Sequence, residues 1–191
     1  MSGNASRREA ASKTGPIETV VTYLEMTAPP KRPRTVAPCP HLEVRRAHAP
    51  MLSFYRYLYD AVGRDWIWTE RKLLADEQLR AIVEHPAVEV NVLWRAGTPA
   101  GYVELDYRGL PKVQIAYFGL VPEFIGQGLG RFLLDWAIFD AWRRDPRRLG
   151  VHTCDLDHPR ALLLYRSLGF RPYRTRREPV ASPPGEVSKP A

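Results

Sequence analysis

Near the middle of the chain the sequence reads Val121-Pro-Glu-Phe-Ile-Gly-Gln-Gly-Leu-Gly-Arg131. The apolar run 113–120 before it predicts a strand, and the helical spacing of apolar residues over 132–143 predicts a helix after it. Glycine lets a ligand approach the backbone closely, and the first turn of a helix presents unpaired N–H groups and a positive dipole end. The stretch therefore predicts an anion site suited to phosphate, with Gln127 and Arg131 at its rim.

The glycine spacing alone does not identify the ligand. The pattern is G-x-G-x-G, whereas the dinucleotide fingerprint needs G-x-G-x-x-G, and no P-loop run is present. Glycines between a strand and a helix also serve tight packing. The surrounding sequence has to decide between these readings.

Working outward, hydrophobic patterns predict an alternation of strands and helices. Strands are expected at 42–45, 88–94, 101–107, 113–120 and 150–154, with a last one beginning at Phe170; helices are expected at 51–62, 75–84, 132–143 and 160–167. This mixture predicts an α+β (mixed α/β) fold.

The two ends of the chain differ in composition from the middle. Residues 1–15 and 179–191 are polar or Pro-rich and are expected to be disordered. Residues 16–40 are expected to hold an extra strand, at 17–26, followed by a Pro-rich linker, and we treat that strand as an addition to a domain over 41–178.

Composition sets further bounds. The chain has 191 residues, 45% of them hydrophobic and 26% charged, with no run near the roughly 20 apolar residues of a membrane helix and no secretory pattern at its start. A cytoplasmic protein without a membrane partner is expected. Cys39 and Cys154 lie in no metal-ligand pattern, so both are expected to be reduced and no metal site is predicted.

The net charge of +7 is concentrated towards the C-terminus. From Arg143 to Arg177 there are ten arginines against three acids. Such a surplus attracts phosphate, which leaves a nucleotide cofactor, a nucleic acid or simply a solvated basic face as readings.

Two segments resemble a known family. The run Ala116-Tyr-Phe-Gly-Leu-Val-Pro-Glu-Phe-Ile-Gly-Gln-Gly-Leu-Gly-Arg-Phe-Leu-Leu134 resembles the central motif of the GNAT acetyltransferases, and His158-Pro-Arg-Ala-Leu-Leu-Leu-Tyr-Arg-Ser-Leu-Gly-Phe170 resembles their second signature. The resemblance covers roughly 42–175. It implies a mostly antiparallel, twisted sheet flanked by helices and splayed at its central strand, and an enzyme that moves an acetyl group from acetyl-CoA to a primary amine by direct attack.

The resemblance also implies roles for particular residues. Tyr165 would be the general acid that protonates the leaving thiolate, and the Leu120 N–H would polarise the thioester carbonyl. Backbone groups of Phe118 and Leu120 would hold the pantetheine arm. The amides of Gly126, Gln127, Gly128, Leu129, Gly130 and Arg131 would hold the pyrophosphate. Without the motif, Tyr165 would read as a packed aromatic of an amphipathic helix.

Two positions depart from the family pattern. Ile125 stands where Arg or Gln is usual, and His158 replaces an Asn near the pantetheine. His158 can still form a hydrogen bond, or it can act only as a surface residue before Pro159.

The general base is less clear. Some relatives use a carboxylate early on the central strand, but Gln114 occupies the matching position and cannot accept a proton in that way. Glu104 and Asp106 on the preceding strand are the nearest acids and share one face, so we name Glu104 as the candidate base. The alternative is an ordinary exposed strand face.

An aromatic segment is expected to form the acceptor side. Tyr55, Tyr59, Trp66 and Trp68 are predicted to line the acceptor pocket, with Glu70 or Asp65 holding a cationic amine. Core packing would explain about half of these residues equally well.

Three alternatives remain open from the sequence. Gln114 and Ile125 are compatible with a non-catalytic CoA-binding regulatory module. The arginine surplus is compatible with a nucleic-acid-binding protein, although no exposed aromatics are interleaved with it. The strand at 17–26 could pair across subunits in a homodimer.

Overall fold

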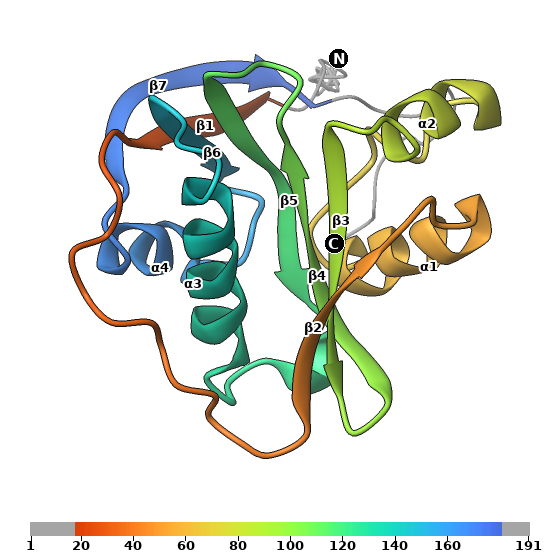
Figure 1. Ribbon diagram of the computed structural model, residues 1–191. Helices are drawn as coiled ribbons and strands as arrows, with labels where there is room; N and C mark the ends of the chain where they lie inside the picture. Colours follow the sequence, from red (N-terminus) through yellow and green to blue (C-terminus); the bar gives the residue numbers. More distant parts are fainter. Residues whose placement is uncertain (1–17, 181–191) are drawn as a thin grey trace, which may run out of the picture.

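The computed structural model describes residues 18–180. The strands are β1 (Glu18–Met26), β2 (Leu42–Ala47), β3 (Val88–Arg95), β4 (Thr98–Asp106), β5 (Lys112–Leu120), β6 (Arg148–Cys154) and β7 (Arg171–Pro179). The helices are α1 (Leu52–Gly63), α2 (Asp76–Val83), the short 3-10 helix η1 (Pro122–Phe124), α3 (Leu129–Trp142) and α4 (Ala161–Ser167). All seven strands form one sheet in the order β2-β3-β4-β5-β6-β1-β7 (Figure 1). The predicted mixed α/β fold is confirmed.

Helices cover both faces of the sheet. One core lies between the sheet and α3 and α4, and includes Val103, Leu105 and Leu134. The other lies between the sheet and α1 and α2, and includes Tyr102 and Leu58. Successive residues of β4 thus point into opposite cores, which is why its sequence is apolar almost throughout.

The N-terminal strand is not an addition to the sheet. β1 lies between β6 and β7 and pairs antiparallel with both, and its Leu24 and Met26 are buried in the core beneath α3. We treated this strand as an addition to the domain; in the structure both of its hydrogen-bonding edges are used within the chain. For the same reason β1 has no free edge for pairing across subunits.

A strap of residues 27–41 connects β1 to β2 along the outside of α3 (Figure 1). Asp135 of α3, almost fully buried, forms an ion pair with Arg32 and accepts a hydrogen bond from the Thr35 N–H at 2.5 Å. The Arg34 guanidinium lies over the ring of Phe139, 4.9 Å from its centroid. The strap then brings Pro38 against the glycine loop.

Most elements begin and end within a few residues of their predicted bounds. The main difference is α3, which begins at Leu129 rather than at 132, directly after Gly128 adopts a left-handed conformation. β7 extends through Pro179, one residue past the expected end of the domain. Residues 1–17 and 181–191, which hold the N-terminal segment and most of the tail expected to be disordered, lie outside the described residues. Within 18–180, none of the helices has the length and apolar character to cross a bilayer.

Candidate active site

The site forms where two parallel strands separate. β5 pairs with β6 only from Lys112 to Ile115. There β5 also has a bulge towards β4: Leu105 faces Ile115 and Glu104 faces Tyr117, so that Ala116 is unpaired. Beyond this point the two strands diverge around a cavity of about 620 Å³. The predicted splay at the central strand is confirmed.

One end of the cavity is the glycine loop. Gly126 and Gly128 have φ angles of +84° and +79°, which favour glycine, and Gly128 caps α3. The first bond of the helix runs from the Phe132 N–H to the Gly128 carbonyl at 3.2 Å. Within residues 18–180, the amides of Leu129, Gly130 and Arg131 therefore have no acceptor. These free N–H groups at a helix N-terminus fit a phosphate.

The residues of this loop divide into two sets. Gly126, Gly128, Gly130 and Arg131 line the cavity, together with Arg160 from the arginine-rich region. Gln127 instead bonds to Arg95 and to the Glu123 carbonyl, and the Leu129 side chain is buried in the core. Any contribution of Gln127 and Leu129 to phosphate binding would come from their backbone.

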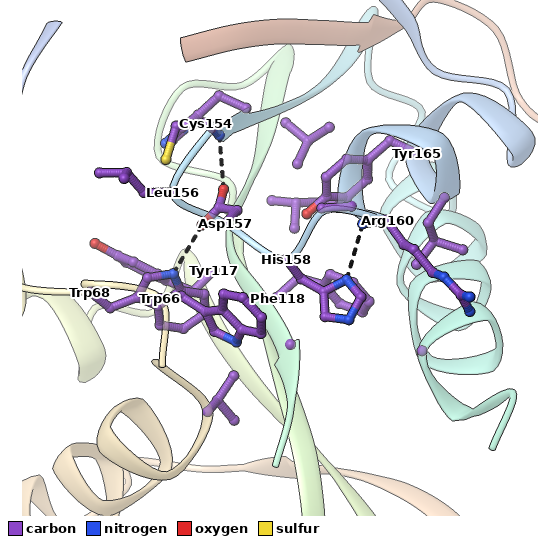
Figure 2. A pocket seen from close by; sticks show the side chains of 18 of the residues that line it. Trp66, Trp68, Tyr117, Phe118, Cys154, Leu156, Asp157, His158, Arg160 and Tyr165 are labelled. Carbon is purple, nitrogen blue, oxygen red and sulfur yellow. Dashed lines mark hydrogen bonds between the residues drawn. The ribbon is translucent and has the colours of Figure 1, made fainter. Parts of the chain in front are cut away.

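Tyr165 of α4 faces the middle of the cavity (Figure 2). Its side chain is only 5% exposed and packs edge-on against Phe118, with ring centroids 6.1 Å apart. Burial, reinforced by the negative charge of Asp157, raises the pKa of Tyr165 above its usual range. Its hydroxyl has no hydrogen-bond partner within residues 18–180, so it is a protonated donor free to bond to a ligand.

His158 also lines the cavity, as predicted. Its Nδ1 accepts a hydrogen bond from the Arg160 N–H at 3.1 Å, and its ring meets that of Trp66 edge-on at 5.1 Å between centroids (Figure 2). The Nδ1 is thereby occupied, and Nε2 is the atom left for a ligand.

The other end of the cavity is aromatic. Tyr59, Trp66, Trp68 and Tyr117 line it. The Trp68 Nε1–H donates to Asp157 at 3.3 Å, and the second oxygen of that carboxylate accepts from the Thr153 hydroxyl and the Cys154 N–H (Figure 2). These bonds join the loop after α1 to the turn after β6, on opposite sides of the cavity. Three of the four predicted acceptor-side aromatics are therefore placed there.

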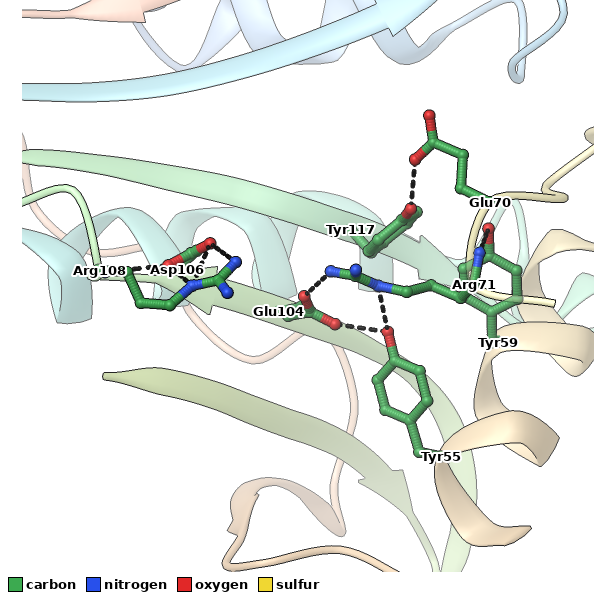
Figure 3. Close-up of polar contacts among 8 residues, drawn as sticks. All are labelled: Tyr55, Tyr59, Glu70, Arg71, Glu104, Asp106, Arg108 and Tyr117. Atoms are coloured by element: carbon green, nitrogen blue, oxygen red, sulfur yellow. Dashed lines mark hydrogen bonds and ion pairs between the residues drawn. The ribbon is translucent and has the colours of Figure 1, made fainter. Parts of the chain in front are cut away.

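Tyr55 and Glu104 lie elsewhere. Glu104 is fully buried, forms an ion pair with Arg71 at 2.6 Å and accepts a hydrogen bond from the Tyr55 hydroxyl at 2.5 Å (Figure 3). Neither residue lines the cavity. Asp106 is held by Arg108 at 2.6 Å, also away from the cavity. The structure thus does not support Glu104 as general base, because its charge is already neutralised and a ligand in the cavity cannot reach it.

Some cavity residues were missed by the sequence analysis. Tyr117 and Asp157 flank predicted positions but carry no motif signal of their own. Thr19 and Val21 of β1 and Glu178 of β7 line the cavity because β1 is inserted next to β6. That pairing joins distant segments, and no local pattern could have revealed it.

With this geometry described, comparison with known proteins identifies the family. The model of a family described as "Acetyltransferase (GNAT) family" matches residues 42–170. The chain belongs to the GNAT acetyltransferases. The family uses acetyl-CoA as co-substrate, and the free amides of the glycine loop fit the phosphates of such a molecule.

Individual relatives of this GNAT chain are distant. A Bacillus subtilis (strain 168) protein named "putative ribosomal protein bS18-alanine N-acetyltransferase" is 30% identical over 105 residues, which are 55% of this chain and 65% of that protein. A GCN5-related N-acetyltransferase from Sphaerobacter thermophilus has a TM-score of 0.61 at 20% identity, over 88% of this chain and 53% of its own. The ribosomal-protein-S18-alanine N-acetyltransferase of Escherichia coli has a TM-score of 0.57 at 15% identity, over 78% of this chain and 99% of its own. The two solved structures support the fold alone, and this GNAT chain spans less than two thirds of the curated relative, 65%, and about half of the first structure, 53%.

Proposed function

We propose that this protein transfers the acetyl group of acetyl-CoA to a primary amine by direct attack of the amine nitrogen on the thioester carbonyl. The observation that carries the proposal is a single cavity that joins the free amides of the glycine loop, the hydroxyl of Tyr165 and the aromatic end. In this proposal the three parts of the cavity serve as anion site, proton donor and acceptor pocket. We place the reaction in the cytoplasm.

The cofactor end is assigned as follows. The amides from Gly126 to Arg131 bind the pyrophosphate, with Arg131 and Arg160 adding positive charge at the cavity wall. The edge of β5 that has separated from β6 offers backbone groups of Phe118 and Leu120 to the pantetheine arm. Acetyl-CoA supplies the activated thioester.

Two groups then act at the reacting atoms. The Leu120 N–H donates to the carbonyl oxygen as negative charge develops there. The Tyr165 hydroxyl donates its proton to the leaving sulfur. Since its pKa is raised, Tyr165 holds that proton at neutral pH until a stronger base, the thiolate, forms beside it.

The acceptor class to test first is the α-amine of a peptide. Both the Bacillus subtilis and the Escherichia coli relatives carry the alanine amine of a ribosomal protein in their names. Peptides with different N-terminal residues therefore belong in the screen with lysine and small alkyl amines.

A thermal-shift titration with acetyl-CoA, CoA and dephospho-CoA tests the proposal. At a hundred times its dissociation constant, a ligand that binds only the folded state adds about 2.7 kcal/mol of stability, which corresponds to roughly 5–10 °C for a chain of this size. We expect this shift with acetyl-CoA and a smaller one with dephospho-CoA if an arginine holds the 3′-phosphate. No shift with any of the three would contradict the proposal, and binding without turnover on any amine would favour the non-catalytic module.

A further inference from the structure

Among the carboxylates of the cavity wall, Glu70 is the one that lies beside the aromatic rings and keeps an oxygen for which the described residues supply no donor. It lies in the connection between α1 and α2, and one oxygen, Oε2, accepts a hydrogen bond from the Tyr117 hydroxyl at 2.6 Å. The other oxygen has no donor within residues 18–180. Asp157 differs, because both of its oxygens are bonded to the protein, and Glu178 accepts a hydrogen bond from Tyr23 at 2.6 Å.

The charge of Glu70 is not compensated. Arg71 is the adjacent cation, but its guanidinium is ion-paired to the buried Glu104 at 2.6 Å (Figure 3). No lysine or arginine in the described part of the chain forms an ion pair with Glu70. Glu70 therefore presents to the aromatic end of the cavity a carboxylate that no cation of the described residues pairs with and that has one oxygen left for a cationic ligand.

The surroundings of Glu70 are also suited to a cation. Tyr59, Trp68 and Tyr117 form a three-ring cluster, with centroids 5.1–5.4 Å apart, next to this carboxylate. Aromatic rings attract ammonium groups by their quadrupole and exclude water from around them. Carboxylate and rings together recognise a positive charge attached to an apolar body.

The backbone next to Glu70 is anchored by the adjacent residue, Arg71. The Arg71 N–H donates to the Tyr59 hydroxyl at 3.3 Å, and the Arg71 side chain reaches Glu104 and the Tyr55 hydroxyl inside the protein (Figure 3). This buried anchor holds the connection to the sheet beside Glu70, whose exposed carboxylate is oriented on the cavity wall by the Tyr117 hydroxyl. A preorganised charge loses little free energy to ordering when it binds its partner.

We propose that Glu70 binds the acceptor as an ammonium ion and then takes a proton from it. This inference rests on the proposed acetyl transfer and names its substrate class: amines that are positively charged at neutral pH. The ammonium gives one proton to the Glu70 carboxylate, and the neutral nitrogen attacks the carbonyl carbon as the carbon–sulfur bond breaks. The thiolate takes the Tyr165 proton, the phenolate recovers one from the acylated nitrogen, and Glu70 releases its proton to water.

Binding of benzylamine and benzyl alcohol tests the recognition step. The two molecules have the same shape, but at neutral pH only benzylamine is a cation. Titrated by calorimetry or NMR into the full chain with CoA bound, benzylamine should bind wild type about fivefold more tightly, as expected for an ion pair with an exposed carboxylate that is assisted by ring contacts. Glu70→Gln should remove this preference.

Asp65→Asn provides the matched control. Asp65 lies in the same connection and is exposed, but it does not line the cavity. Its removal should leave the preference for benzylamine intact. Equal binding of the two probes to wild type, no binding of benzylamine at millimolar concentration, or an equal loss in Asp65→Asn would overturn the proposal.

Rates test the proton transfer. On the best acceptor of the amine screen, Glu70→Gln should lower kcat/KM about a hundredfold at unchanged KM for acetyl-CoA, because general-base assistance is worth roughly 10²–10⁴. Tyr117→Phe keeps the Glu70 carboxylate but removes its hydrogen bond, so its kcat/KM should lie between those of wild type and Glu70→Gln. Unchanged rates in Glu70→Gln would overturn the role in proton transfer.

The two levels of the proposal fail in different ways. If wild type shows no thermal shift with acetyl-CoA, the proposed function itself is wrong. If acetyl-CoA binds and is turned over while Glu70→Gln behaves as wild type, only the assignment of Glu70 is wrong.

Discussion

At the scale of single residues, Tyr165 combines a buried side chain and an unbonded hydroxyl with a place on the cavity wall, whereas the buried and unbonded Tyr102 and Tyr107 do not line the cavity. Because that hydroxyl has no partner within residues 18–180, Tyr165→Phe should leave the melting temperature nearly unchanged. It should lower kcat about a hundredfold, since the leaving sulfur loses its proton donor, with little change in KM for acetyl-CoA. Steady-state kinetics and thermal unfolding of the same preparation measure both.

Tyr57→Phe is the control for this substitution. Tyr57 lies on α1 and is half exposed, and it does not line the cavity. Equal rates for Tyr165→Phe and Tyr57→Phe would exclude Tyr165 as the acid.

The role of Gly126 can be tested by comparison with another glycine that has nearly the same φ angle. Gly126 and Gly97 have φ angles of +84° and +83°, and an added Cβ would have nothing within 4 Å at either position. Alanine should therefore cost each about 1 kcal/mol of stability, from the left-handed conformation alone. Gly126→Ala alone should weaken CoA binding, by about tenfold, because its methyl group would displace the phosphate from the loop amides.

The comparison is a CoA titration of both variants after their unfolding has been measured. Gly97 lies in the turn between β3 and β4, so an equal loss of CoA affinity in Gly97→Ala would show that instability, and not the phosphate contact, weakens binding.

At the scale of elements, the strap over α3 depends on one buried carboxylate. Burial alone would raise the pKa of Asp135, but hydrogen bonds from Arg32 and Thr35 outweigh it and lower the pKa. A lowered pKa in the folded state means that the stabilisation is present above the unfolded value of about 3.9 and is lost as the pH falls through the folded value. Asp135→Asn should cost about 2 kcal/mol at pH 7, and the difference from wild type should shrink below about pH 4.

Urea unfolding at pH 7, 5 and 3.5 measures this dependence. Asp140→Asn is the matched control on the same helix, because its 3.4 Å pair with Arg143 lies at the surface and should contribute less than about 0.5 kcal/mol. A difference between Asp135→Asn and wild type that stays constant with pH would contradict the assignment.

The elements also show how far the sequence could lead. The glycine loop could be predicted because its chemistry is local: three glycines, a strand before and a helix after. The role of Glu104 could not be predicted, because the alternation along β4 shows on which face of the sheet Glu104 lies but not which residue forms an ion pair with it. That partner, Arg71, lies 33 residues away in an irregular connection, and only the folded chain brings the two together.

At the scale of the whole molecule, β1 connects the edge strand β7 to the other five strands of the sheet. Its removal would leave β7 without a sheet partner and expose the edge of β6. A chain beginning at Thr27 should therefore fail to give a cooperative unfolding transition, whereas one beginning at Pro16 should unfold like wild type. Circular dichroism during heating distinguishes them, and cooperative unfolding of the shorter chain would show that β1 is dispensable.

The position of β1 within the sheet could not be predicted from the sequence, for a related reason. The alternation over 17–26 indicates a strand with one buried face, but it is silent on which strands lie beside it. The register joins Val21 to Cys154 on one side and Thr22 to Thr175 on the other. Pairings over such separations are set by the global packing and not by the residues nearby.

The position of β1 also bears on the order in which the protein is made. Of the seven strands β1 leaves the ribosome first, yet its neighbours β6 and β7 are translated last. While β2 to β5 are made, the nascent chain carries a half-apolar strand with no partner, a form exposed to aggregation and to chaperones. Since β1 and β7 both contribute to the cavity wall, the active site can be completed only after β7 has left the ribosome.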